Sequence, residues 1–437
     1  MTLSLKAKHL QRYKDVAALA LKYRGLSRPP DAEGQPSEKS GGVKPEELAS
    51  DLERLGPTFV KLGQLLSARG DLLAPPYLDA LRRLQDKVAP FSYAEVEEIV
   101  QAELGVRISK AFSSFEREPA AAASLGQVHR AALRDGRAVA VKVQRPGIQE
   151  QISDDLEAFR EIAQVLAGHT ETFDVEGMLE EFRKTLLKEL DYRQEAQNLV
   201  TLGAALTEFP RLVVPQPVDD YTTSRVLTMD LISGAKVTTL SPLAKIDIDG
   251  AGLAEELFRA YLKQILVDGF FHADPHPGNI FLTDDGRLAL LDLGMVARLT
   301  PTLRDQLLKL LIAVSEGRGD QAAEEIEKFG EKLPTYDEKE MKRRVGELVG
   351  VFQHATVSEL QLGRIVMDIS RYASECGMRI PSELTMLGKT LLNLDEIGRT
   401  LVPAFDPNAS IRKNSAELLT RRMRQSATPG NVFASLL

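Results

Sequence analysis

Three oxygen-bearing side chains stand at a spacing that suits phosphate chemistry. Asp274 and Asn279 lie five residues apart in the sequence His-Ala-Asp-Pro-His-Pro-Gly-Asn, and Asp292 follows thirteen residues after Asn279 in Asp-Leu-Gly. The prolines exclude a regular helix over this loop. Carboxylate and amide oxygens suit Mg²⁺, which takes few protein ligands and keeps room for phosphate oxygens. A kinase places its base and metal ligands in this order, so the spacing predicts phosphoryl chemistry.

Two histidines, His272 and His276, flank Asp274 in the same loop. Histidines bind metals, but the Asp and Asn oxygens favour hard Mg²⁺ over Zn²⁺, so we interpret the histidines as residues that brace the loop. The alternative for the whole segment is a polar turn whose Asp and Asn cap helices. Order and spacing together favour phosphate chemistry over that alternative.

A lysine stands in an apolar strand upstream. Lys142, in Ala-Val-Ala-Val-Lys-Val, is costly to bury without a partner, and kinases use such a lysine to hold the α- and β-phosphates. A helix predicted through Asn198 carries Asp191 and Glu195 four residues apart on one face. Glu195 is the candidate ion-pair partner of Lys142. The alternatives are a lysine that reaches out to water and a solvated acidic face.

The loop before this strand is rich in alanine where a kinase has glycine. Consecutive alanines restrict φ and favour helix, so we expect phosphate contacts that differ from those of an ordinary protein kinase. The residues concerned are Ala121, Ala122, Ala123 and Ser124.

The elements that must position these residues predict an α+β fold. A helix over 3–24 places Leu10, Tyr13, Ala17 and Leu21 on one stripe, and either packs on a core or lies on an anionic membrane surface. Hairpins are expected at 126–143 and 280–291, each around an Asp-Gly turn. We divide the chain into a basic helix and linker (1–44), a helical extension (45–111), a sheet-containing N-lobe (112–232) and a mostly helical C-lobe (233–437). This is the order of a two-lobed kinase with extra helices in front.

Composition limits the class of partner. The net charge is −8 and the body of the chain has no basic tract, so nucleic-acid binding is not expected. A single cysteine, Cys376, excludes an intramolecular disulfide and fits a reducing compartment. No stretch reaches the roughly 18 apolar residues of a membrane-spanning helix. We expect a cytoplasmic protein, with any membrane contact peripheral to the inner face.

Together these motifs resemble the UbiB family, also called AarF or ADCK, atypical kinases tied to ubiquinone and isoprenoid-lipid metabolism. The resemblance runs from about Leu52 to Leu303. It includes a KxGQ signature, the alanine-rich loop, the strand lysine, an ExD motif, the catalytic loop and the Asp-Leu-Gly triad. The residues not yet named are Lys61 and Gln64 of KxGQ, Glu189 and Asp191 of ExD, and the hinge-like Met229, Asp230 and Ile232.

The resemblance implies a role for each position. Lys142 holds phosphates with Glu195 as its partner, Asp274 is the candidate base, and Asn279 and Asp292 bind Mg²⁺. The alanine loop and the hinge contact ATP, while Lys61 and Gln64 contact the ExD pair. Only a short segment separates Asp-Leu-Gly from the next helix, and Ala273 replaces the arginine of the kinase His-Arg-Asp, which argues against a peptide substrate.

The expected activity is that of a Mg-ATP-dependent atypical kinase or ATPase with a small or lipid acceptor. Expected partners are ATP and ADP, a lipid or quinone precursor, and a membrane surface. One alternative is a nucleotide-gated scaffold that presents lipids without phosphotransfer. Another is a small-molecule kinase of the aminoglycoside or choline type, against which the KxGQ and alanine motifs argue.

Overall fold

A computed structural model describes residues 10–23, 44–67, 73, 75–84, 89–167, 175–354, 362–407, 409–410 and 414. It divides into two compact units. Unit 1 comprises Met1–Gln197 and Gln216–Leu231, and unit 2 comprises Asn198–Pro215 and Ile232–Leu437. Helix α9 (Tyr192–Ala205) therefore begins in unit 1 and ends in unit 2.

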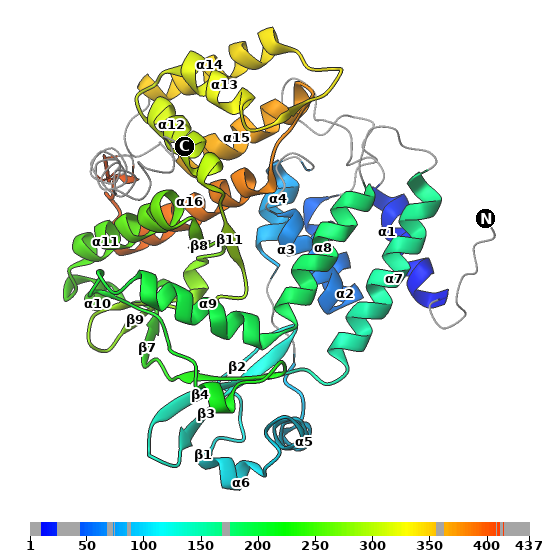
Figure 1. Cartoon of the computed structure of the whole chain (residues 1–437), viewed down its shortest axis with the longest axis vertical. Helices are drawn as coiled ribbons and strands as arrows, with labels where there is room; N and C mark the ends of the chain where they lie inside the picture. The colour runs from blue at the N-terminus through cyan, green and yellow to red at the C-terminus, as the bar shows by residue number, and fades with distance from the viewer. Residues whose placement is uncertain are drawn as a thin grey trace, which may run out of the picture. The chain divides into compact units, whose positions relative to one another are not determined.

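Unit 1 contains an antiparallel sheet in the order β1-β3-β4-β6, with the short β2 paired to β3 (Figure 1). The predicted first hairpin is confirmed, with Gly136 at φ 90° in its turn. Val139, Val141 and Val143 on β4 are fully buried, and Lys142 points to the opposite face because strand side chains alternate. The strands are β1 (Phe112–Phe115), β2 (Ala121–Ala122), β3 (Gly126–Leu133), β4 (Ala138–Gln144) and β6 (Val226–Asp230).

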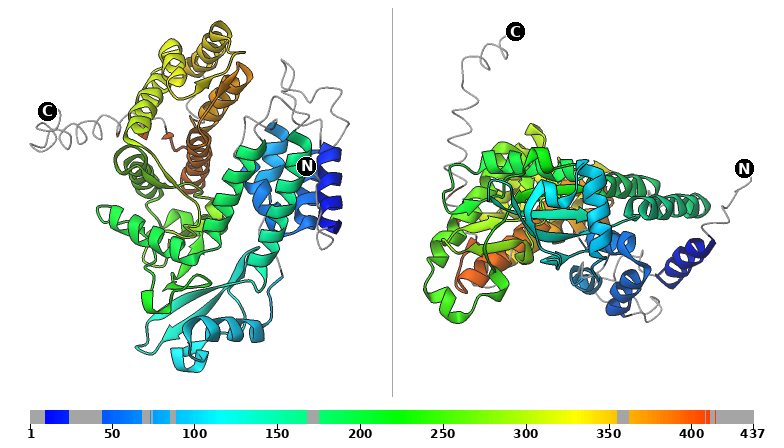
Figure 2. Two further views of the ribbon diagram at one scale, coloured as in Figure 1. Left: turned by 45° about the vertical axis from the view of Figure 1, so that its right-hand side comes forward. Right: turned by 90° about the horizontal axis from the view of Figure 1, so that it is seen from below.

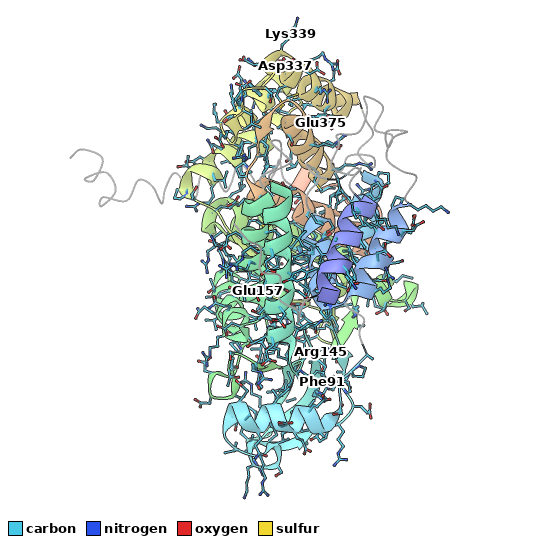
Figure 3. The ribbon with its side chains drawn as sticks, turned by 90° about the vertical axis from the view of Figure 1, so that its right-hand side faces the viewer. Phe91, Arg145, Glu157, Asp337, Lys339 and Glu375 are labelled. Carbon is cyan, nitrogen blue, oxygen red and sulfur yellow. The ribbon has the colours of Figure 1, made fainter. Side chains whose placement is uncertain are left out.

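Helix α5 (Tyr93–Leu104) packs on this sheet. Its N-terminus carries a capping box, since Ser92 and Glu95 exchange side-chain and backbone hydrogen bonds. Figure 3 labels Phe91 and Arg145, whose guanidinium carbon lies 5.4 Å from the Phe91 ring centroid. Arg145 also donates to the carbonyl of Ala89 at 2.9 Å. These contacts fix the segment that leads into α5 against the end of β4.

A second group of helices in unit 1 shares one apolar core. Gly63 of α3 packs closely against leucine side chains of this core. A Cβ at this position would lie 2.3 Å from Leu84 Cδ1 and 2.9 Å from Leu52 Cδ1. The glycine therefore permits α3 to pack between its neighbours. The helices are α1 (Leu10–Tyr23), α2 (Pro45–Leu55), α3 (Pro57–Leu66), α4 (Pro75–Arg82), α7 (Ile148–Ala167) and α8 (Val175–Glu189).

The predicted apolar stripe of α1 is confirmed at Tyr13 and wrong at Leu21. Tyr13 and Val16 are buried, whereas Leu21 is 65% exposed, and the side chain of Leu10 lies outside the described residues. The helix packs beside α7 (Figure 2), where Arg12 binds the buried carboxylate of Asp155. The tertiary contacts of Arg12 and Tyr13 rotate the buried face away from Leu21. Of the two interpretations, α1 follows core packing.

The single helix predicted through Asn198 is also wrong. The helix is interrupted at Leu190 and Asp191, so that α8 ends at Glu189 and α9 begins at Tyr192. Asp191 Oδ1 accepts the amide of Arg193 at 3.1 Å, the bond of an N-cap residue. Asp191 and Glu195 therefore do not share a helix face, because Asp191 precedes the helix.

Unit 2 places a small sheet, in the order β5-β10-β9-β7, among helices. A separate pair joins β8 to β11. The predicted second hairpin is confirmed as β9 and β10. The strands are β5 (Leu212–Val213), β7 (Gly234–Lys236), β8 (Phe270–His272), β9 (Ile280–Thr283), β10 (Leu288–Leu290) and β11 (Val296–Arg298).

The remaining helices of unit 2 include a close pair, α15 and α16, held together through Gly363 and Gly388. Helix α16 also packs against α11 and β11 (Figure 1). Among the described residues, no helix is long and apolar enough to cross a membrane. The main helices are α11 (Gly250–Lys263), α12 (Pro301–Ser315), α13 (Gly319–Glu327), α14 (Glu338–His354), α15 (Leu362–Glu375) and α16 (Ser382–Leu401).

Candidate functional site

The strand lysine of unit 1 has the expected carboxylate partner. Lys142 Nζ lies 2.8 Å from Glu195 Oε2 and 3.1 Å from Oε1, and the two side chains are 19% and 6% exposed. The ammonium also lies 5.1 Å from the centroid of the Tyr192 ring. A Cβ on Gly126 would lie 2.5 Å from the Val143 carbonyl and 2.6 Å from the Tyr192 hydroxyl. Glycine at 126 therefore lets β3 pass close to the α9 start, which carries Glu195.

The KxGQ and ExD motifs meet within unit 1. Lys61 Nζ lies 3.0 Å from Glu189 Oε2, with side chains 17% and 9% exposed. Gln64 lies one turn further along α3 and is half-buried. Asp191, the last ExD residue, caps the helix that carries Glu195. The ExD motif thus supplies both the carboxylate that pairs with Lys61 and the N-cap of α9, the helix that carries Glu195.

The alanine loop is extended rather than helical, contrary to the preference of consecutive alanines. Ala121 and Ala122 form β2 against Val128 and Gln127, and Ala123 donates its amide to the Gly126 carbonyl at 2.8 Å. Pairing with β3 overrides local propensity here. Ala121 is exposed, but Ser124 is fully buried, so its side chain does not face solvent.

The hinge-like residues occupy the end of β6. Met229 and Asp230 are half-buried, and Ile232 follows outside unit 1. The Asp230 carboxylate binds Arg137 at 2.5 Å and accepts the Gln216 amide at 3.0 Å. The Asp230 side chain is therefore committed to contacts of the sheet.

The catalytic-loop segment of unit 2 begins at the end of β8, and its histidines have structural partners. The fully buried His272 places Nδ1 3.2 Å from the Tyr261 hydroxyl. Burial lowers the pKa of His272 below its ordinary value. His276 Nδ1 accepts the Gly278 amide at 3.0 Å, and the His276 amide donates to the Asp274 carbonyl at 2.7 Å. These contacts are those of side chains that brace a loop.

Asn279 and Asp292 come together at the paired ends of one hairpin. Ile280 pairs with Leu290, and the Leu291 amide donates to the Asn279 carbonyl at 2.9 Å. Asp292 has φ 57°, the one positive value for a non-glycine residue in the described part of the chain. Such backbone strain persists only where surrounding structure enforces it, and it clusters at functional sites.

The donor set at these two positions fits Mg²⁺. One amide oxygen and one exposed carboxylate leave most of an octahedral shell to phosphate and water oxygens. The described residues contain no group of three or more His, Cys, Asp and Glu side chains that could hold a metal by themselves. The arrangement therefore suits a metal that arrives with a phosphate ligand.

Asp274 has partners that sequence reasoning missed. Its Oδ1 lies 3.1 Å from Lys389 Nζ and 3.4 Å from Asn393 Nδ2, both on α16. Burial raises the pKa of the Asp274 carboxyl, but the charge and hydrogen bond of Lys389, together with His272 and His276, outweigh burial, so the pKa falls below its ordinary value. The available signal was a lysine inside the apolar run of α16, which identifies a buried charge without identifying its partner.

Asn198 is a second residue that sequence reasoning did not single out. Its side-chain amide donates to the carbonyl of Leu293, in Asp-Leu-Gly, at 2.9 Å. Asn198 lies three residues after Glu195 on α9. This hydrogen bond, within unit 2, holds the backbone beside Asp292.

Comparison with known proteins identifies two domains in the chain. Residues 83–326 match the ABC1 atypical kinase-like domain and residues 347–406 match the UbiB helical domain. An uncharacterised protein of Synechocystis is 36% identical over 81% of this chain and 90% of its own length. The probable protein kinase UbiB of Cellvibrio japonicus is 35% identical over 83% of this chain and 67% of its own length.

Longer and structurally solved relatives extend the comparison. The Arabidopsis thaliana protein ACTIVITY OF BC1 COMPLEX KINASE 8, chloroplastic, is 34% identical over 86% of this chain, which spans only 54% of that protein. The solved structure of Mycobacterium tuberculosis Rv3197 in complex with erythromycin is similar to this chain, with a TM-score of 0.54 and 27% sequence identity. The match covers 82% of this chain and 96% of the Rv3197 chain. By its domains and its relatives, the chain belongs to the UbiB family of ABC1 atypical kinase-like proteins.

Proposed function

We propose that this protein binds Mg-ATP and uses its γ-phosphate on a small or lipid-like acceptor, or on water, in the service of ubiquinone or other isoprenoid-lipid metabolism. The observation that carries the proposal is the 2.8 Å ion pair between Lys142 and Glu195. A lysine held by a carboxylate in an apolar strand is a preformed phosphate-binding cation, because its position is fixed before the nucleotide arrives.

Unit 2 supports the proposal with the groups that phosphoryl transfer requires. Asn279 and Asp292 would hold Mg²⁺, which supplies positive charge to the phosphate oxygens when it is bound. Asp274 would accept the proton of the attacking hydroxyl. The acceptor oxygen then bonds to the γ-phosphorus as the bond to the β–γ bridging oxygen breaks, and ADP leaves. With water as acceptor, the products are ADP and inorganic phosphate.

The segment after Asp-Leu-Gly supports a non-peptide acceptor. It pairs as β11 with β8, so that Val296 lies opposite His272, and the Ala273 amide donates to the Met295 carbonyl at 3.1 Å. Helix α12 begins at Pro301, directly after this pair. A protein kinase uses a longer activation segment at this place to receive its peptide. We therefore assign the acceptor to small molecules or lipids.

Following the γ-phosphate tests the proposal. Purified protein is incubated with Mg²⁺, γ-labelled ATP, lipid vesicles and a phenolic quinone precursor, with Asp274→Asn as the paired variant. Label on an organic acceptor supports a small-molecule or lipid kinase, and label as free phosphate alone supports an ATPase. Bound ATP without any label movement contradicts the enzyme proposal and favours a nucleotide-gated scaffold.

A further inference from the structure

Helix α16 holds the catalytic loop through three neighbouring side chains. The Thr390 hydroxyl, fully buried, lies within hydrogen-bond distance of two carbonyls, that of Ala273 at 3.0 Å and that of Met386 on its own helix at 2.9 Å. Lys389 and Asn393, on either side of Thr390 along the helix, reach the Asp274 carboxylate at 3.1 and 3.4 Å. The helix therefore contacts both the backbone before Asp274 and the carboxylate itself.

Lys389 brings a charge that the loop lacks. The segment from His272 to Asn279 contains no lysine or arginine, and Ala273 stands where the kinase pattern has arginine. In the described part of the chain, Lys389 is the one lysine or arginine that forms an ion pair with Asp274. The permanent cation beside Asp274 thus comes from α16, a helix that is distant in the sequence.

A role in packing alone does not explain this lysine. Its side chain is only 12% exposed. Burying an ammonium costs free energy that a neutral side chain of similar volume avoids. Thr390 already anchors the loop backbone without a charge. The charge is therefore directed at the carboxylate.

We propose that Lys389 is a positioning residue for phosphoryl transfer, which holds the ionised Asp274 carboxylate in the orientation needed to receive the acceptor's proton. This makes the UbiB helical domain, residues 347–406, a working part of the active site, although it lies outside the kinase-like match at 83–326. The inference rests on the proposed function, because it concerns the same proton transfer.

The test compares Lys389→Gln, which removes the charge and keeps a polar end, with Lys389→Arg, which keeps the charge. Turnover of γ-labelled ATP gives kcat and KM, and a Mg-ATP thermal shift reports nucleotide binding separately. Lys389→Gln is expected to lower kcat about tenfold or more while KM for ATP changes by less than about twofold. Lys389→Arg should recover at least about a third of the wild-type kcat.

Lys342→Met is the control, because Lys342 forms an exposed helical ion pair with Glu338 at 2.7 Å. It should leave kcat unchanged. A kcat for Lys389→Gln equal to that of the wild type, or an equal loss in the Gln and Arg variants, overturns the inference while leaving the proposed function intact. Absence of turnover in the wild type overturns both.

Discussion

Lys61 of the KxGQ helix lies 3.0 Å from Glu189 of the ExD motif, and both side chains are largely buried in unit 1. The pair joins α3 to the end of α8, directly before the break that starts the helix of Glu195. Two sequence motifs separated by more than a hundred residues thus meet in one contact.

Breaking this pair should destabilise the protein. Lys61→Met leaves the Glu189 carboxylate without its ammonium, and we expect the free energy of unfolding in urea to fall by about 1–3 kcal/mol. Adding Glu189→Leu should recover part of the loss, which a double-mutant cycle measures. The control is Lys184→Met, whose ammonium lies 3.8 Å from Glu180 on the exposed face of α8. An equal loss of unfolding free energy in Lys61→Met and Lys184→Met would contradict a stabilising role of the Lys61–Glu189 pair.

Gly63 should tolerate no side chain. Gly63→Ala places a Cβ 2.3 Å from Leu84 Cδ1, and the resulting overpacking should lower the free energy of unfolding by about 1–3 kcal/mol. Gly350→Ala, on α14, is the matched control because a Cβ there meets nothing within 4 Å. That variant should be more stable than the wild type by about 0.5–1 kcal/mol, since alanine is the better helix former. Stabilisation by Gly63→Ala would exclude the close contact.

The Mg²⁺ assignment predicts a selective loss in Asp292→Asn. Asparagine tolerates the positive φ of this position, so the substitution removes the charge without adding backbone strain. The rise in melting temperature on adding Mg-ATP should shrink strongly, whereas the rise with metal-free ATP should not change. Equal Mg-ATP shifts in the wild type and the variant would refute the assignment.

The burial of His129 should make the stability of the protein depend on pH. It is fully buried, with Nδ1 2.8 Å from the Glu116 carbonyl, and burial lowers its pKa below the ordinary value of 6.5. The unfolded chain therefore binds the proton first, so the stabilisation is present above pH 6.5 and is lost as the pH falls below that value. The decrease in unfolding free energy from pH 7 towards acid should be smaller in His129→Gln. An equal dependence of the unfolding free energy on pH in the wild type and in His129→Gln would contradict this account.

The sequence predicted the elements whose patterns are local. Both hairpins follow from apolar runs around Asp-Gly turns. The contact of Lys142 with Glu195 was expected from the residues and their order, and that of Lys61 with Glu189 from the family resemblance, and both are present.

The errors arose where tertiary contacts override local preference. The break at Asp191 lies between two good helix sequences, and only the N-cap bond to Arg193 marks it. The buried face of α1 is set by the contacts of Tyr13 and Arg12 with α7, which the helix's own pattern does not encode. Lys389 meets Asp274 through the packing of α16, so no spacing in the sequence could pair them.

Equilibrium binding of ATP tests the central claim most directly. Titration calorimetry on the wild type should show one ATP site in the presence of Mg²⁺, weakened by about tenfold or more with EDTA and by about tenfold or more in Lys142→Met. Lys184→Met, at an exposed position on α8, should bind as the wild type does. Absence of ATP binding in the wild type, or binding that neither EDTA nor Lys142→Met weakens, would contradict the account.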